Sequence, residues 1–466
     1  MADSHRTAMD LANTVCTVLN SRKLDCPANE HITELFESLY YASLCKEESN
    51  FVSAHIVYLD PKNPDPDPPS RIVKDRWTCV ILEEPLIFNV SNIVKISMST
   101  DPRTSSLAVF HDENNSLSIW GLIDQGNRYN DFVNFDSDSA TKRPGVFQAS
   151  ILGIGHLVAY IGYEKVAELN CDNLIRSSYD ILRGGAVRDI LDIGLERHIE
   201  YIKKYSSDYL TEEYSSLDEH FGLGKHLSDQ WIATICRILL RIQNIGHGGA
   251  ILITQDKSYK WLNIKHGIDY SRLPSALQSY GESFIKREYA SQIIHDVYLE
   301  DDSTDLPMDL YLDESVSGFE LEESKSEIDG TIWFISLLSR VDGLILMTPQ
   351  LEVKGFGVEI TNPNTPKSVF MAGDRYGTGP KLKRIEHTHY GTRHRSMMRY
   401  CGSVPGSLGF VISQDGQVRA MTQVDGKLLI WENIRLQLLD FIKRKIKIKL
   451  KQKIKPKSKR KIKIKP

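Results

Sequence analysis

The sequence predicts a mixed α/β (α+β) protein of two domains, the first rich in β-strands and the second alternating helices with buried strands. Three observations predict it. The chain has 466 residues, whereas one hydrophobic core usually serves roughly 100 to 200. Short apolar runs bounded by turn residues dominate residues 51–123. A helical pattern, a glycine turn and a buried apolar run follow one another between residues 229 and 253.

The composition is that of an ordinary globular protein, with 41% hydrophobic and 25% charged residues. The first 19 residues include Asp3, Arg6 and Asp10 and have no apolar core of the signal-peptide kind. No window reaches about 18 uncharged apolar residues, which is the length of a membrane-spanning helix. We therefore expect a cytoplasmic protein.

Cysteine and histidine spacing gives no sign of a metal site. The seven cysteines are odd in number, scattered, and never spaced as C-x-x-C, so neither a disulfide framework nor a zinc site is indicated. His55, His111 and His156 also lack a metal-ligand spacing. We expect these histidines to be structural or solvated.

The N-terminal part begins with an amphipathic helix at residues 30–45, whose apolar side chains recur at helical spacing. Apolar runs separated by turn-rich segments then predict strands at 51–59, 77–82, 107–111 and 117–123. Residues 146–162 add two apolar runs around Gly153 and Gly155. From residue 171 to residue 222 the pattern turns helical.

A glycine break at Gly222 and Gly224 separates the two domains, which we place at residues 1–222 and 226–440. Ser228 or Asp229 caps the next predicted helix, which runs into a glycine turn at Gly246. Residues 276–330 are rich in acids. We expect an exposed acidic insertion there.

The tail at residues 443–466 carries 14 of the 57 Lys and Arg residues and no acid. The rest of the chain has 43 basic and 61 acidic residues, a net charge of −18. A run this charged and repetitive is typical of disorder. An anionic partner, such as nucleic acid or a lipid surface, is the partner that its charge favours.

The most informative motif is the segment 390–396, Tyr-Gly-Thr-Arg-His-Arg-Ser. Two arginines around a histidine, after a glycine and a threonine, offer forked donors, a ring donor and a hydroxyl. Such a set suits a polyphosphate. Taken alone, a basic triplet is more often a solvated surface.

A second motif lies upstream, where Asp342 and Gly343 precede the apolar run 344–347. An aspartate in this position can hold Mg²⁺ or Mn²⁺ on a triphosphate, and a glycine allows a nucleotide to approach closely. The plain alternative is an Asp-Gly turn before a buried strand.

The order of these motifs resembles the diadenylate cyclase (DAC, DisA N-terminal-like) domain. That family is marked by an Asp-Gly-Ala motif and by an Arg-His-Arg motif, preceded by Gly-Thr and followed by Ser or Thr. Residues 391–396 match the second motif in full. Residues 248–253 resemble the family's early Gly-Ala-Leu strand, and the strand at 409–413 follows in the expected order.

The resemblance implies a central twisted mixed β-sheet flanked by helices, which binds ATP with Mg²⁺ or Mn²⁺ on Asp342. Two copies of the domain, facing each other in a homodimer or higher oligomer, would join two ATP molecules into cyclic di-AMP and release two pyrophosphates. The implied catalytic residues are Asp342, Gly343, Arg393, His394 and Arg395. The implied ATP-binding residues are Gly249, Leu344, Gly391, Thr392, Ser396 and Ser413.

Two departures from the family pattern leave an alternative open. Leu344 stands where the family has alanine, and the acidic insertion separates the first strand from Asp342. The alternative is a catalytically degenerate domain that binds a nucleotide as a receptor without turning it over.

The β-rich residues 30–170 resemble the predicted sensor domain called DACNV, on segments such as 38–44 and 143–147. This resemblance implies an N-terminal domain, within residues 1–222, that senses a signal and controls the cyclase. No ligand motif stands out in it.

Overall fold

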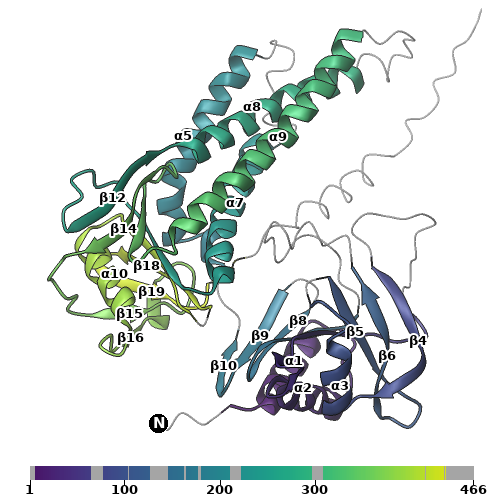
Figure 1. The fold of residues 1–466 in the computed structure, drawn as a ribbon. Coiled ribbons are helices and arrows are strands. Elements are labelled where there is room, and N and C mark those ends of the chain that lie inside the picture. Colours follow the sequence, from purple (N-terminus) through teal and green to yellow (C-terminus); the bar gives the residue numbers. More distant parts are fainter. Residues whose placement is uncertain are drawn as a thin grey trace, which may run out of the picture.

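The structure is a computed structural model, and its two main sheets are mixed, one of eight and one of nine strands, with helices packed against both (Figure 1). This confirms the mixed α/β class. The residues that the structure describes are 6–64, 77–102, 104–125, 145–161, 164–176, 180–209, 222–295, 308–414, 416–434 and 436.

In the N-terminal part, the described residues form an eight-stranded sheet and three helices. The helices are α1 (Ala8–Ser21), α2 (Asn29–Ser43) and α3 (Val90–Ser97). The strands of this sheet are β3 (Ala54–Tyr58), β4 (Thr78–Ile87), β5 (Ser105–His111), β6 (Leu117–Asp124), β7 (Gln148–Gly153), β8 (His156–Ile161), β9 (Glu164–Asn170) and β10 (Asn173–Arg176). A separate small hairpin pairs β1 (Lys46–Glu47) with β2 (Asn50–Phe51).

This sheet has the order β10-β9-β8-β7-β3-β5-β6-β4, and all its pairs are antiparallel except β3 with β5. Ile56 and Tyr58 of β3 point into an apolar cluster shared with the three helices, whereas Val57 between them joins a smaller cluster on the opposite face. The alternation follows from the period of two along a strand. The three helices therefore cover one face of the sheet.

Most N-terminal predictions are confirmed. Helix α2 covers residues 30–43 of the predicted 30–45 and buries Ile32, Leu35, Phe36 and Leu39. The helical interpretation from residue 171 onward is wrong for its first residues, because β10 pairs there with β9. Val166 and Leu169 of β9 are buried in the main cluster of the N-terminal part. Pairing with this buried strand favours a strand over a helix at β10.

The three histidines singled out in the sequence each have a hydrogen-bond partner inside the sheet. His55 lies 2.6 Å from the Ser150 hydroxyl, and His111 lies 2.7 Å from the Tyr58 hydroxyl. His156 lies 2.6 Å from Glu168. Burial alone would raise the pKa of Glu168, but the hydrogen bond from His156 and the charge of Lys165 outweigh it and hold that pKa at about 2.

The C-terminal part is built around the nine-stranded sheet. Its helices are α5 (Ala186–Tyr209), α7 (Leu223–Ile245), α8 (Arg272–Ile293), α9 (Met308–Leu338) and α10 (Thr392–Ser403), with short 3-10 turns at Ile181–Arg183 and Gly379–Lys381. Its strands are β11 (Gly249–Ile253), β12 (Leu262–Tyr270), β13 (Leu344–Met347), β14 (Val353–Ile360), β15 (Val369–Met371), β16 (Lys383–Ile385), β17 (Leu408–Ile412), β18 (Val418–Val424) and β19 (Lys427–Trp431).

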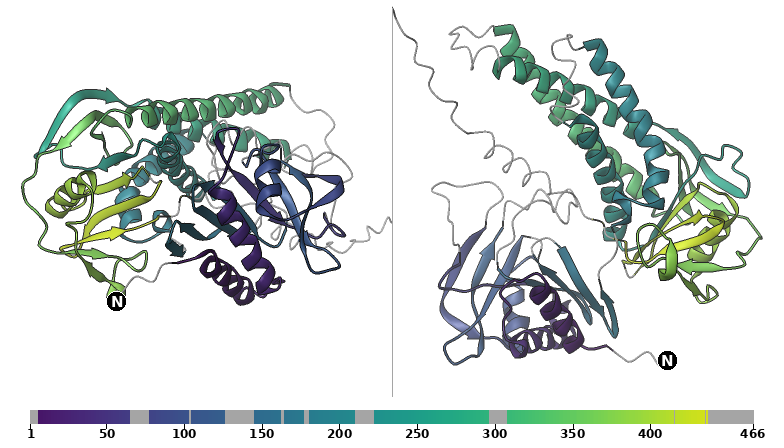
Figure 2. Two further views of the ribbon diagram at one scale, coloured as in Figure 1. Left: turned by 60° about the horizontal axis from the view of Figure 1, so that its bottom comes forward. Right: turned by 180° about the vertical axis from the view of Figure 1, so that it is seen from behind.

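The strand order is β12-β14-β13-β11-β17-β18-β19-β15-β16, with parallel pairs at β11/β13 and β15/β19. Ile251 and Ile345 face a cluster that includes residues of α5, α7, α8 and α9, whereas Ala250 and Leu346 face a second cluster that includes residues of α10. The four long helices lie next to one another beside the sheet (Figure 2). A central mixed sheet flanked by helices is thus confirmed.

The predicted boundary at residues 222–226 falls between two helices that share one core. Leu191 and Leu195 of α5 pack in the same cluster as Trp231 of α7. The predicted cap at Ser228 or Asp229 is wrong, because α7 already begins at Leu223, after Gly222 in the left-handed conformation. The division into domains therefore stays a prediction, and α5 packs with the C-terminal sheet.

The acidic segment 276–330 is more than an exposed insertion, and that expectation is corrected for its described residues. Most of it forms α8 and α9, which pack along each other. Leu277 and Tyr280 of α8 and Leu321 and Ile328 of α9 are buried in the main cluster. Acidic side chains occupy the outer faces, so composition alone hides the core-facing stripes.

Two expectations lie beyond what the described residues can address. Residues 443–466 are outside the described ranges. Among the helices in those ranges, none is both long and apolar enough to cross a membrane. Cytoplasmic localisation stays a prediction.

Two leucines test whether the acidic segment belongs to the core. Leu321 of α9 is 3% exposed, and Leu152 of β7 is 53% exposed. We expect Leu321→Ala to lower the free energy of unfolding by about 2–5 kcal/mol. The matched Leu152→Ala should change it by less than about 0.5 kcal/mol. Urea unfolding measures both, and equal losses would contradict the packing of α9.

Candidate functional site

The predicted motifs meet at one edge of the C-terminal sheet. Ile251 of β11 pairs in parallel with Ile345 of β13, which sets Gly249 beside Gly343 two residues earlier on both strands. Gly249 also pairs with Ile412 of β17, so Ser413 lies just beyond the same edge. The starts of β11 and β13 and the end of β17 thus bring Gly249, Gly343 and Ser413 to one place.

Gly248 marks the centre of this edge. It has φ of 71°, and a Cβ placed on it would lie 2.8 Å from Nη1 of Arg393. A side chain at this position would displace the Arg393 guanidinium. The predicted contact residue Gly249 is buried on the opposite face, where an added Cβ would meet Ile242 of α7 at 2.6 Å. Gly248 is therefore the glycine that allows the arginine to approach.

Asp342 is exposed at the start of β13, and Gly343 follows it with φ of 121°. An added Cβ on Gly343 would lie 2.5 Å from the carbonyl carbon of Gly357 on β14. Close strand packing alone therefore requires the glycine. The Asp342 carboxylate remains accessible for a ligand.

Leu344 has its side chain in the apolar cluster between the sheet and α10. It is 6% exposed and shares that cluster with Met397 and Val358. The bulk of this leucine is therefore accommodated by packing. Its predicted contact with a nucleoside stays a prediction.

Helix α10 presents the second motif on its first turn. Gly391 is the N-cap, and the helix begins at Thr392 because Met397, Met398, Tyr400 and Cys401 form a buried stripe against the sheet. Thr392 and Arg395 are exposed, Arg393 and Ser396 are half-buried, and His394 is buried. A helix N-terminus with free backbone N–H groups favours anions.

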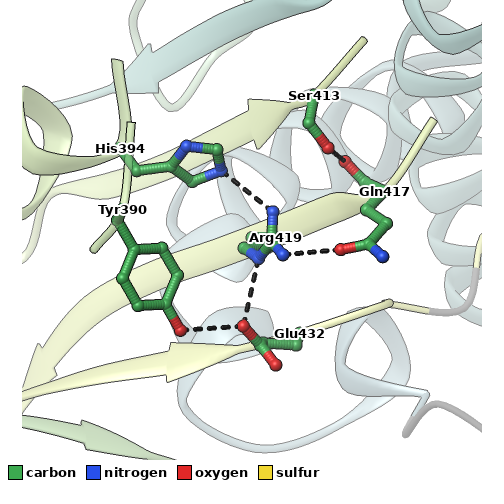
Figure 3. Close-up of polar contacts among 6 residues, drawn as sticks. All are labelled: Tyr390, His394, Ser413, Gln417, Arg419 and Glu432. Atoms are coloured by element: carbon green, nitrogen blue, oxygen red, sulfur yellow. Dashed lines mark hydrogen bonds and ion pairs between the residues drawn. The ribbon is translucent and has the colours of Figure 1, made fainter. Parts of the chain in front are cut away.

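Arg419 of β18 joins the helix to the sheet (Figure 3). Its guanidinium donates to Nε2 of His394 at 3.1 Å, to Glu432 at 3.2 Å and to the Gln417 side chain at 2.5 Å. An arginine cannot accept a hydrogen bond, so Nε2 of His394 is the acceptor and the neutral ring carries its proton on Nδ1. The network fixes both the orientation and the tautomer of His394.

Tyr390 and Ser413 extend this network at its two ends. The Tyr390 hydroxyl donates to Glu432 at 2.8 Å, and Ser413 donates to the Gln417 carbonyl at 3.0 Å. Burial, and then the nearby Glu432 charge, raise the pKa of Tyr390 well above its usual value. Tyr390 therefore stays a protonated donor at neutral pH.

Sequence reasoning missed Tyr390, Gln417, Arg419 and Glu432 as members of the site. A signal was present on β18, where Arg419 stands between the apolar Val418 and Ala420. A charged residue inside a buried strand needs a partner. The partner, Glu432, lies just beyond β19 and is brought there by strand pairing.

The arrangement of acidic, histidine and cysteine side chains bears on metal binding. Within the described ranges, no group of three or more His, Cys, Asp or Glu side chains is gathered so that it could hold a metal ion. Asp342 would have to share a metal with a ligand's own oxygens.

Comparison with known protein families gives a match in the N-terminal part. A family described as "Probable sensor domain DACNV" matches residues 21–124, which run from the end of α1 to the end of β6. No curated protein and no solved structure matches the chain. The chain thus carries an N-terminal DACNV probable sensor domain, and its sheet continues past the matched residues through β7 to β10.

The Arg419 network makes a prediction for stability. Arg419→Met leaves the Glu432 carboxylate, which is 27% exposed, without its guanidinium. We expect a loss of about 1–3 kcal/mol of unfolding free energy. The double variant Arg419→Met with Glu432→Gln should lose less than the two single changes together.

Arg384→Met serves as the control, because Arg384 is exposed and, among the described residues, donates only to a carbonyl at 3.4 Å. Additive losses in urea unfolding of the Arg419 and Glu432 variants would contradict a coupled network.

Proposed function

We propose that this protein is a diadenylate cyclase, which condenses two ATP molecules into cyclic di-AMP and two pyrophosphates under the control of its N-terminal sensor domain. One observation carries the proposal. The Asp342-Gly343 segment and the first turn of α10 reach the same sheet edge around Gly248, in the order of motifs that resembles the family.

The chemistry of this edge suits a triphosphate. Arg393 offers a forked guanidinium beside Gly248, and the N-terminal N–H groups of α10 add oriented donors. The hydroxyls of Thr392 and Ser396 lie one turn apart on the same face of this helix. His394, held by Arg419, positions this turn against the sheet. Phosphoryl-type transfer depends mainly on such positioning and on neutralised charge.

A divalent cation fits the donor set. Mg²⁺ and Mn²⁺ in nucleotide sites commonly take one or two carboxylates and complete their shell with phosphate oxygens and water. The exposed Asp342 is the carboxylate that would hold the ion. When bound, the ion would offset negative charge on the phosphates.

The reaction requires a second copy of the domain. In each half, the 3′-oxygen of one ATP forms a bond to the α-phosphorus of the other, and the bond from that phosphorus to pyrophosphate breaks. The proton of the 3′-hydroxyl passes to water, and Asp342 would help to activate this hydroxyl. A single domain supplies only half of the reacting groups, so an isolated monomer should be inactive.

Product formation tests the proposal. The full-length protein, incubated with ATP and Mg²⁺ or Mn²⁺, should form cyclic di-AMP detectable by mass spectrometry. Asp342→Asn should lower the rate at least about 10²-fold, because charge stabilisation in the transition state is lost. Its melting temperature should be unchanged, since the side chain is exposed.

Asp269→Asn is the matched control. Asp269 is an exposed aspartate that forms an ion pair with Lys354. It lies at the end of β12, where Tyr270 pairs with Val353, and this end of the sheet is the far one from Asp342. Its rate should equal that of the wild type. Binding of a non-hydrolysable ATP analogue without any product would favour the receptor alternative. A protein that neither binds nor reacts would rule out both.

A further inference from the structure

The first half of α9 carries an exposed apolar stripe. Met308, Leu312, Val316 and Phe319 are 69%, 50%, 52% and 74% exposed. Their spacing of four, four and three residues places them on one helix face. We call these four residues the α9 stripe. Phe319 leaves more of its area to solvent than any of the other large apolar residues of the described chain.

The α9 stripe lies opposite the face by which the helix joins the core. Leu321, Ile328 and Ile332 are at most 3% exposed and pack in the main cluster. At about 100° per residue, Phe319 and Leu321 point in nearly opposite directions. The apolar residues of the stripe are therefore not needed for packing within the described fold. Apolar side chains gathered on such a face mark an interaction surface.

Acidic residues that form no ion pair with any residue of the described ranges lie beside the stripe. They are Asp309, Asp313 and Glu323. Other acids of α9 are paired, such as Glu320 with Lys286 and Glu327 with Arg272. The surface thus combines an apolar stripe with unneutralised negative charge. A partner that fits it is basic and has apolar side chains between its charges.

Charge argues against a second copy of α9 on this surface. Two such faces would bring their unpaired carboxylates together, and like charges in contact are unfavourable. Residues 443–466 of this chain have the complementary chemistry. They alternate Lys with Ile or Leu over 445–450 and carry 14 basic residues and no acid.

The length of the chain permits this contact. Leu436 is buried in the same cluster as Leu321 of α9. The 30 residues after Leu436 span up to about 100 Å when extended. Helix α9 has 31 residues, which is about 46 Å at 1.5 Å per residue. The tail can therefore reach the start of α9 from the point where the described chain ends.

We propose that the Lys-rich tail, residues 443–466, docks on the α9 stripe of its own chain, with its Ile and Leu side chains on the stripe and its lysines at the bordering carboxylates. The proposal is independent of the cyclase activity. It assigns the tail an anionic partner within the molecule.

Zero-length carbodiimide cross-linking of the full-length protein tests this contact, because the reagent joins only carboxylates and amines that touch. We expect mass spectrometry to find cross-links from tail lysines to Asp309, Asp313 or Glu323. The double variant Leu312→Ser with Phe319→Ser keeps every carboxylate but removes the apolar contact. It should lose these cross-links. Ile87→Ser, which changes a residue of β4 that is 69% exposed, should keep them.

Hydrogen exchange of residues 308–323 gives a second readout. In the full-length chain, the tail variant Ile446→Ser, Ile448→Ser and Leu450→Ser should speed exchange in that segment. Unchanged exchange would overturn the proposal. Three cross-linking results would also overturn it. The cross-links could persist in the double serine variant, or they could fall mainly on Glu83 or Glu84. In an isotopically mixed sample, they could join only different copies of the chain.

Discussion

Burial of the central strands of the nine-stranded sheet on both faces is the constraint on which the C-terminal part depends. All residues of β11, β13 and β17 are buried, and their alternate side chains enter two separate apolar clusters. Such strands can carry polar chemistry only where they start or end. This is why Asp342, Ser413 and the glycines at 248 and 249 gather at one edge, where α10 also begins.

The Arg419 network ties this edge together. One guanidinium, on β18, reaches the helix through His394 and the last strand through Glu432. Each partner limits the movement of the others, because a half-buried charge is costly without its hydrogen bonds. The orientation of the first turn of α10 therefore depends on a residue in the middle of the sheet. A pre-positioned turn of this kind is what binding a flexible polyphosphate requires.

Local patterns predicted much of the fold, and pairing between distant segments explains the rest. Helix α2 and the strands β11, β13 and β17 follow from spacing and from apolar runs bounded by glycine. The helices α8 and α9 were hidden by their acids, and β10 was hidden because a hairpin partner decides its state. The motif residues Asp342 and Arg393 were found from sequence. Arg419 and Glu432 were missed, because only the pairing of β18 with β19 brings them together.

The claim that this edge binds ATP through Arg393 is the centre of the account. Calorimetric titration of the full-length protein with a non-hydrolysable ATP analogue tests it most directly. A charged hydrogen bond contributes about 1.5–3 kcal/mol, so Arg393→Ala should weaken binding about ten- to a hundredfold. Equal affinity in the variant, or no binding by the wild type, would contradict the account.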